Sequence, residues 1–202
     1  SYDDIIALKG IEELVERYYN EGFFKHSTEY LIRNHFASPF KFFEDLMHYW
    51  KSRGYYEYSH SRESLYEILL EYYKSREFVG LKVFKDLLTL DHLENNGGKQ
   101  IPGFLSETDN QASIDYHAIL KTDYILNRFL PEYLGIPTKK VLKRVRLHSF
   151  THDICKIIDD GYIVNGHVNK TLILFKYTDG TIERCKKYNI TNHVEEFADG
   201  YN

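Results

Sequence analysis

The sequence predicts an α+β fold, mostly helical over its first two-thirds and antiparallel β after that. Up to Pro137 the apolar residues recur every three or four positions, which is the period of an amphipathic helix. From Val141 they alternate with polar residues, as in a strand. The charge changes at the same place, because residues 1–137 carry 15 basic and 22 acidic side chains and residues 138–202 carry 11 and 8. We therefore predict a helical region at 1–137, a small antiparallel β region packed on it at 138–192, and a poorly ordered tail at 193–202.

The composition is that of a globular protein. Of the 202 residues 43% are apolar and 28% are charged, and the formal net charge of −4 argues against a nucleic-acid partner. No run approaches the ~18 apolar residues of a membrane span, and no signal segment opens the chain, so we expect a cytoplasmic location and no membrane partner. The start at Ser1, without a methionine, fits an excised fragment. Cys155 and Cys185 are too few for a disulfide framework and are expected to be reduced thiols.

Three helices are predicted before residue 55. The first starts at the hydroxyl and carboxylates of residues 1–4, and a shorter one covers residues 27–35, with Tyr30, Leu31 and Asn34 in register. Ser38 and Pro39 form the cap and first-turn proline of the third, which Gly54 ends. The expected core face of the first helix is Ile5, Leu8, Ile11, Val15 and Tyr18, with Leu14 and Tyr19 beside it. The third carries Phe40, Phe42, Phe43, Leu46, Met47, Tyr49 and Trp50.

Residues 61–96 form the part of the chain around which the rest is expected to pack. They read as two amphipathic helices joined by a polar bend at residues 74–77, and the second ends at the asparagines and glycines of residues 95–98. Their apolar stripes are Leu65, Ile68, Leu69, Tyr72 and Tyr73, then Leu81, Phe84, Leu87 and Leu88.

The segment from residue 97 to the β region starts with an aperiodic stretch, residues 97–112, whose length is typical of a functional or mobile loop. A helix then resumes and ends at Pro131, because proline disfavours its continuation. That helix is expected to hold Ile114, Ile119, Leu120, Tyr124 and Ile125 on its apolar side.

The β region is predicted to be a sheet of about three strands. In the first strand Val145 and Leu147 alternate with Arg144, Arg146 and His148. Residues 171–177 and 181–188 form the other two, joined by a hairpin turn at Asp179-Gly180. A two-residue turn there pairs Lys176 with Glu183 and Tyr177 with Ile182.

The nearest arrangement to a metal site consists of His148, His152, Asp153 and Cys155. Two histidines four residues apart share one face of a helix, but these fall in a strand pattern, so we expect a half-exposed strand end and no metal. Residues 139–146, KKVLKRVR, could contact phosphate or RNA; a solvated strand face, or one that docks on an acidic neighbour, is favoured. The tyrosine pairs at 18–19, 55–56 and 72–73 could stack a planar ligand, but core-rim positions are favoured. No catalytic residue is predicted.

A family resemblance adds a functional expectation. Residues 6–32, IALKGIEELVERYYNEGFFKHSTEYLI, and 38–50, SPFKFFEDLMHYW, resemble the C-terminal domain that follows the barrel in bacterial cobalamin-binding radical SAM proteins. Members are often labelled anaerobic magnesium-protoporphyrin IX monomethyl ester cyclase-like, or Fe-S oxidoreductases. LYEILLEYY at 65–73 and ILFKY at 173–177 also resemble it, so the likeness covers most of the chain.

The resemblance implies an accessory domain that covers or supports a catalytic barrel and has no catalytic centre of its own. The parent protein would hold a [4Fe-4S] cluster, S-adenosylmethionine and cobalamin in upstream radical SAM and B12-binding domains, which would be the partners of this chain. The three-cysteine motif for the cluster and the histidine-bearing loop of a B12 domain have no counterpart here. The alternative is a free-standing helical protein-interaction module; an independent hydrolase or metalloenzyme is disfavoured by the missing motifs.

An exposed aromatic patch on the first three helices follows from the accessory-domain interpretation. A neighbouring domain would cover this patch, and an isolated chain would self-associate through it. The competing expectation is an ordinary core. The rings concerned are Tyr18, Tyr19, Phe23, Phe24, Tyr30, Phe36, Phe40, Phe42, Phe43, Tyr49 and Trp50.

Overall fold

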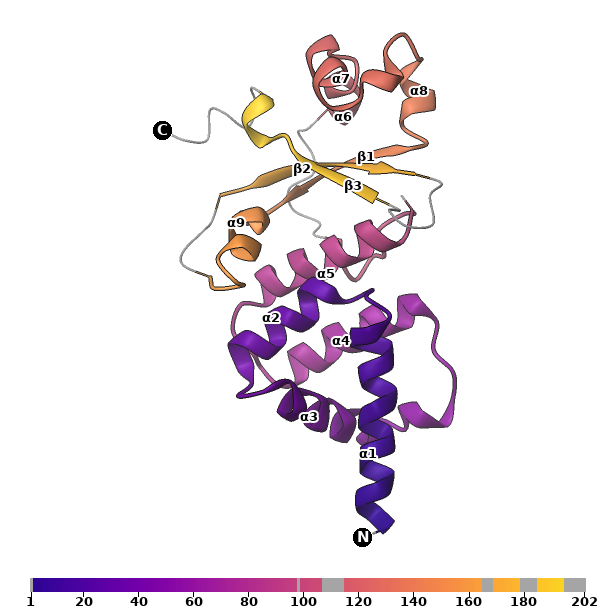
Figure 1. The fold of residues 1–202 in the computed structure, drawn as a ribbon, viewed down its shortest axis with the longest axis vertical. Coiled ribbons are helices and arrows are strands. Elements are labelled where there is room, and N and C mark those ends of the chain that lie inside the picture. The colour runs from indigo at the N-terminus through magenta and orange to yellow at the C-terminus, as the bar shows by residue number, and fades with distance from the viewer. Residues whose placement is uncertain (1, 98, 107–114, 165–168, 179–184, 195–202) are drawn as a thin grey trace. The chain divides into compact units, whose positions relative to one another are not determined.

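The fold is α+β, as predicted, with helices followed by a three-stranded antiparallel sheet (Figure 1). The structure, a computed structural model, describes residues 2–97, 99–106, 115–164, 169–178 and 185–194. It contains two compact units. The helical unit is Ser1–His92 with Ile157–Val164, and the sheet unit is Leu93–Lys156 with Asn165–Asn202. The secondary structure does change near residue 137, but the domain boundary predicted there stays a prediction.

The helical unit starts with the three predicted helices. They are α1 (Tyr2–Val15), which continues as a π-helix at Glu16–Asn20, α2 (Lys25–His35) and α3 (Pro39–Ser52). A 3₁₀ turn, Tyr55–Glu57, leads to α4 (Arg62–Ser75), and α5 (Leu81–Asn95) follows. The predicted start of α3 is confirmed, because Ser38 accepts a hydrogen bond from the Lys41 N–H at 3.3 Å and Pro39 occupies the first turn.

The core of the helical unit is aromatic, and several of its phenol groups are hydrogen-bonded. The predicted stripe of α4 is buried throughout, and α5 buries its own stripe except for Leu81. Tyr18 donates to the Leu65 carbonyl at 3.2 Å and Tyr66 to the Phe23 carbonyl at 2.9 Å, so each ring joins two segments. Tyr72 donates to Asp45 at 2.6 Å. The interpretation of the 72–73 pair as ordinary packing residues is therefore supported, and both rings lie fully in the core.

The predicted core face of the first helix is right only in part. Tyr18 is buried as predicted, and so is Leu14 beside it, whereas Ile5 and Leu8 are more than half exposed. Gly10 explains the difference, because a Cβ there would lie 3.1 Å from both Met47 Cγ and Tyr56 Oη. The missing side chain lets α1 approach its neighbours along the face of residues 10, 14 and 18 instead.

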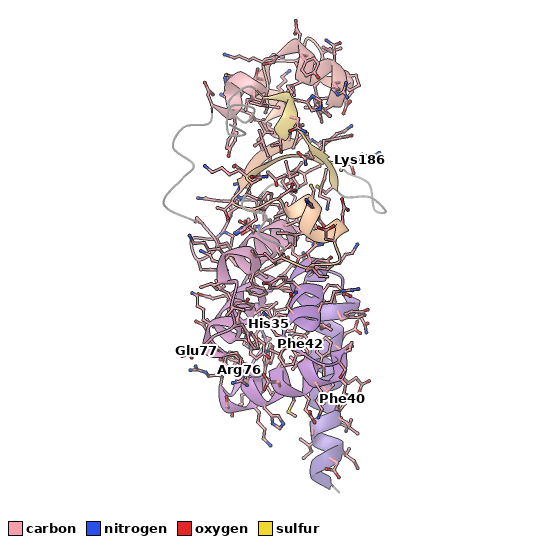
Figure 2. All side chains as sticks on the ribbon, turned by 90° about the vertical axis from the view of Figure 1, so that its left-hand side faces the viewer. His35, Phe40, Phe42, Arg76, Glu77 and Lys186 are labelled. Carbon is pink, nitrogen blue, oxygen red and sulfur yellow. The ribbon has the colours of Figure 1, made fainter. Side chains whose placement is uncertain are left out.

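The bend between α4 and α5 lies slightly later than predicted, at residues 76–80. Glu77, labelled beside Arg76 in Figure 2, has a left-handed φ of 52°, and Gly80 has a φ of 88°. Glycine is required at position 80 for space as well, since a Cβ there would meet Tyr30 Oη at 2.5 Å.

The sheet unit contains β1 (Val145–Phe150), β2 (Thr171–Tyr177) and β3 (Cys185–Asn189), in that order and all antiparallel. The predicted hairpin register is wrong, because Lys176 pairs with Lys186 and Tyr177 with Cys185. Asp179, Gly180, Ile182 and Glu183 lie outside the described residues. The Lys176 ammonium forms an ion pair with Glu132, a residue that precedes the hairpin by about 40 positions in the sequence.

Short helices cover one face of the sheet (Figure 1). They are α6 (Tyr116–Ile119), α7 (Asp123–Phe129), a 3₁₀ turn at Pro131–Tyr133, and α8 (Thr138–Val141). Another helix, α9 (Ile154–Asp159), and a 3₁₀ turn, Thr191–His193, flank β2 in the sequence. The aliphatic core between the sheet and the helices α6 to α8 is formed by Ile119, Leu120, Ile125, Leu126, Leu130, Val141, Val145, Leu147, Leu172, Leu174 and Ile190.

The single helix expected to end at Pro131 is instead two. Asp115 caps α6 by accepting from the His117 and Ala118 N–H groups, both at 3.0 Å, and the chain turns before α7 starts at Asp123. Val141 likewise ends a helical turn rather than starting a strand. Residues 107–114 and 195–202, parts of the predicted loop and tail, lie outside the described residues.

Candidate functional site

The residues singled out as a metal arrangement do not form one site. His148 lies in β1 and is buried rather than half-exposed; its ring packs edge-on against Phe150. His152 Nδ1 lies 2.9 Å from Thr151 Oγ1, and Asp153 accepts the Lys156 N–H at the start of α9 at 3.1 Å. Across the described ranges no three His, Cys, Asp or Glu side chains are grouped to hold a metal ion. That the protein binds no metal stays a prediction.

The basic run at residues 139–146 is divided between a helix and a strand. Lys139 and Lys140 are exposed on α8, and Arg146 is half-buried in β1. The Arg146 Nη1 donates to the Lys99 carbonyl at 2.7 Å. The run therefore does not form one continuous cationic face.

A buried carboxylate, Asp91, is the main polar group that the sequence analysis missed. It lies on α5 and is fully buried. Its Oδ1 accepts the His26 N–H at 2.9 Å, and its Oδ2 accepts the Ser27 N–H at 2.8 Å and the Ser27 hydroxyl at 2.6 Å. The carboxylate thus caps α2, 64 residues away. A signal was present, since Asp91 follows Leu87 and Leu88 at helical spacing on the apolar stripe.

The surroundings of Asp91 make it a structural rather than a reactive group. Burial raises the pKa of this carboxyl to about 6, although the charge of His26 and the hydrogen bonds from His26 and Ser27 act to lower the pKa. His26 Nδ1 in turn lies 3.0 Å from the Tyr162 hydroxyl, and Tyr162 has a left-handed φ of 69°. This network joins residues 157–164 to the rest of the helical unit and is sealed from solvent.

The surface that offers a functional site on the helical unit is a groove of about 500 Å³ between α1, α2 and α3, which we call the apolar groove. It is lined by Ile11, Val15, Tyr19, Glu29, Ile32, Arg33, Pro39, Phe40 and Phe43. The charged side chains on its lining are one ion pair, Arg33 Nε to Glu29 Oε2 at 3.0 Å. The groove therefore suits an apolar partner surface with few charges.

The apolar groove continues along α1 and gives the exposed residues a common location. Ile5 and Leu8, 55% and 56% exposed, precede Ile11, Val15 and Tyr19 on the same face of α1. Phe40 is 50% exposed, whereas Phe42 two residues later is buried; both are labelled in Figure 2. Contiguous apolar surface of this kind marks interaction sites.

The expected aromatic patch differs from this groove in its composition. Only Tyr19 and Phe40 of the eleven rings are largely exposed; Phe23 and Phe36 are half-buried. The others, Tyr18, Phe24, Tyr30, Phe42, Phe43, Tyr49 and Trp50, belong to the core. The competing expectation of an ordinary core thus holds for most of them, and aliphatic residues of α1 supply the rest of the exposed face.

The cysteines of this chain do not fit the iron–sulfur cluster that the resemblance implies. A radical SAM cluster needs three cysteine thiolates, and the sequence holds two cysteines, which are not joined in a disulfide. Within the described residues no helix is both long enough and apolar enough to cross a membrane.

Comparison with known proteins gives one family. Searches of curated proteins and of solved structures found no match. A family model with the description "Protein of unknown function (DUF4080)" matches residues 1–175, which include the whole helical unit, β1 and most of β2. The chain therefore belongs to the DUF4080 family.

Proposed function

We propose that this chain is the accessory C-terminal domain of a B12-binding radical SAM protein and that its apolar groove packs against the catalytic part of that protein. Family membership supports the proposal, because this domain is found in radical SAM and B12-binding proteins. The sequence resemblance over residues 6–32 and 38–50 supports it independently. The parent would be a cytoplasmic Fe-S oxidoreductase, of the type labelled magnesium-protoporphyrin IX monomethyl ester cyclase-like.

The observation that carries this proposal is the apolar groove. Tyr19 and Phe40 in the groove are half-exposed, and Ile5 and Leu8 beside it are exposed as well. A neighbouring domain that covers these side chains removes their apolar surface from water, which is favourable. Contacts between domains of one chain bury roughly 600–1,500 Å², and a groove along three helices fits that scale. We assign the [4Fe-4S] cluster to an upstream domain because two cysteines cannot supply its three thiolates, and S-adenosylmethionine and cobalamin to upstream domains on the sequence resemblance.

Hydroxyl-radical footprinting of the full-length parent and of the 202-residue chain tests the proposal. We expect Tyr19 and Phe40 to be labelled in the isolated chain and protected in the parent. Tyr58, which is 55% exposed and lies outside the groove, is the matched reference and should be labelled equally in both. Equal labelling of Tyr19 in both proteins would contradict the interface.

Two further measurements separate this proposal from a free-standing interaction module. An accessory domain requires a CxxxCxxC motif upstream in the same gene, whereas a free-standing module does not. Sedimentation of the isolated chain should show self-association that Phe40→Asp reduces and Val79→Asp, at an 81% exposed position outside the groove, does not. A monomer at high concentration would argue that the groove is not an interface.

A further inference from the structure

The sheet unit has a pocket of its own, of about 390 Å³, along the edge strand β1. Its polar lining comes from Tyr116 on α6, from Lys143, Arg146 and His148, and from Tyr177 on β2. The apolar lining is three aliphatic side chains within residues 142–147. The volume is at the small end of the range for ligand pockets, roughly 300–1,000 Å³.

The charge of this pocket is positive. Lys143 and Arg146 contribute two cations, and no described lining residue is acidic. Burial raises the pKa of the Tyr116 hydroxyl and lowers the pKa of the His148 imidazole, and the nearby Arg146 guanidinium acts on both groups in the lowering direction. Arg146 Nη1 also donates to the Lys99 carbonyl at 2.7 Å, which helps to hold the side chain in place.

The neutral polar groups of the lining add hydrogen-bonding capacity. His148 is buried, pairs with Ile173 across the sheet and packs edge-on against Phe150 with ring centres 4.6 Å apart. The Tyr116 hydroxyl is buried, and although the Ser149 backbone acts on its pKa, no hydrogen bond of ordinary geometry reaches it from the described residues. Tyr177 donates to the Leu93 carbonyl at 2.9 Å, so it presents its ring to the pocket.

We propose that this pocket binds a small organic anion, a carboxylate or phosphate group carried on an apolar body. Lys143 and Arg146 would bind the anionic group by charge-assisted hydrogen bonds. The aliphatic side chains and the Tyr177 ring would contact the apolar body. The pocket favours a small molecule over a nucleic acid because the other cations of the basic run, Lys139, Lys140 and Arg144, are not part of its described lining. This inference does not rest on the proposed function of the helical unit.

Titration of the isotopically labelled chain with defined probes, followed by NMR, tests the inference. Phenyl phosphate and benzoate carry the anion on a ring, inorganic phosphate lacks the ring, and phenol lacks the anionic oxygens. We expect saturable shifts of the residue 143–148 amides with at least one of the two ring anions and weaker binding of inorganic phosphate and phenol. Comparing the two ring anions identifies the preferred anionic group.

Variants within one basic run provide the controls. Lys143→Gln, at an exposed position where folding is not at risk, and Arg146→Gln should each weaken binding about tenfold or more, the loss expected for a charge-assisted hydrogen bond. Arg146→Lys should retain part of the affinity, which guards against reading a folding defect as lost binding. Lys140→Gln removes the same charge outside the pocket and should change affinity about twofold or less. Absence of saturable binding, or an equal effect of Lys140→Gln, would overturn the inference.

Discussion

The helical unit and the sheet unit differ in the side chains that form their cores. The helical unit buries rings such as Tyr18, Tyr66 and Tyr72, whose hydroxyls bond to backbone or carboxylate groups of other segments. The sheet unit packs an aliphatic core under its short helices. Each of these tyrosines therefore contributes apolar area and a specific polar link, whereas each aliphatic side chain contributes area and shape alone.

The two units also bury titratable groups of opposite behaviour. Asp91 in the helical unit has a pKa raised by burial to about 6, and His148 in the sheet unit has a pKa lowered by burial, and then by Arg146, to about 3. Both shifts favour the neutral form of the side chain. Burial therefore gives the two units opposite pH dependences of stability, because the neutral form of an acid is the protonated one and the neutral form of a base is the deprotonated one.

The largest expected effect is a cavity in the aromatic core. Phe24→Ala removes a fully buried ring that lies 4.8 Å from Tyr18 and 4.4 Å from Tyr66, centre to centre. It should lower the free energy of unfolding of the helical unit by about 4 kcal/mol. Urea unfolding followed by the fluorescence of Trp50, the one tryptophan of the chain, measures this unit.

The control for this prediction is Phe40→Ala, the same deletion at a half-exposed position in the apolar groove. It should cost less than about 1 kcal/mol in the isolated chain, because little packing is lost there. Equal effects of the two substitutions would mean that the core does not centre on Phe24.

The next effect is the pH dependence of the helical unit. Because the folded state binds the Asp91 proton more tightly than an ordinary carboxyl of pKa 3.8 does, this contribution is fully present below pH 3.8 and is lost as the pH rises through 6. The loss amounts to about 3 kcal/mol, at 1.36 kcal/mol per pKa unit. Urea unfolding of wild type and Asp91→Asn from pH 4 to 7 should show the wild type losing stability relative to the variant.

The sheet unit should show the opposite trend. An unperturbed histidine has a pKa of 6.5, and the pKa of His148 in the folded protein is about 3, so the unfolded chain binds this proton more tightly than the folded one. Its contribution is present above pH 6.5 and is lost as the pH falls towards 3. NMR signals of β1 and β2 during urea unfolding of wild type and His148→Leu provide the measurement. Trends of the same sign in the two units would break the comparison.

A smaller effect is expected from one hydroxyl of the aromatic core. Tyr66→Phe keeps the ring and removes the bond to the Phe23 carbonyl, so it should cost about 1 kcal/mol. Tyr19→Phe removes a hydroxyl from a half-exposed ring and is the matched control, with no expected loss. Chemical denaturation followed by Trp50 fluorescence measures both. A neutral Tyr66→Phe would show that the polar links add nothing to the burial of the rings.

The smallest effect is expected at a surface ion pair. Lys41 Nζ lies 2.7 Å from Glu44 Oε2, and the two side chains are 60% and 34% exposed. Lys41→Gln should change the free energy of unfolding by less than about 0.5 kcal/mol, because water and salt screen the pair. Thermal unfolding at low and high salt measures it, and a loss comparable to that of Tyr66→Phe would be contrary to expectation.

The sequence by itself determined the features that depend on neighbouring residues. Ser38 and Pro39 set the start of α3, and the spacing of Leu65, Ile68 and Leu69 set the buried face of α4. Alternation predicted β1, and β-branched and aromatic residues predicted β2. These signals are local, because capping and periodicity act within a few residues of the backbone. The apolar periodicity of residues 5–18 likewise predicted a helix, but it did not identify which face of that helix is buried.

Only the tertiary structure decided the features that depend on residues far apart in the chain. Gly10 selects the buried face of α1 through contacts with Met47 and Tyr56. Asp91 caps α2 from 64 residues away, and the β2–β3 register differs from the one that a two-residue turn at Asp179-Gly180 would give. The pocket around Arg146 likewise forms only when α6 and β2 meet β1. Periodicity identifies an apolar stripe, but the partner that covers the stripe, or leaves it as the apolar groove, is set by long-range packing.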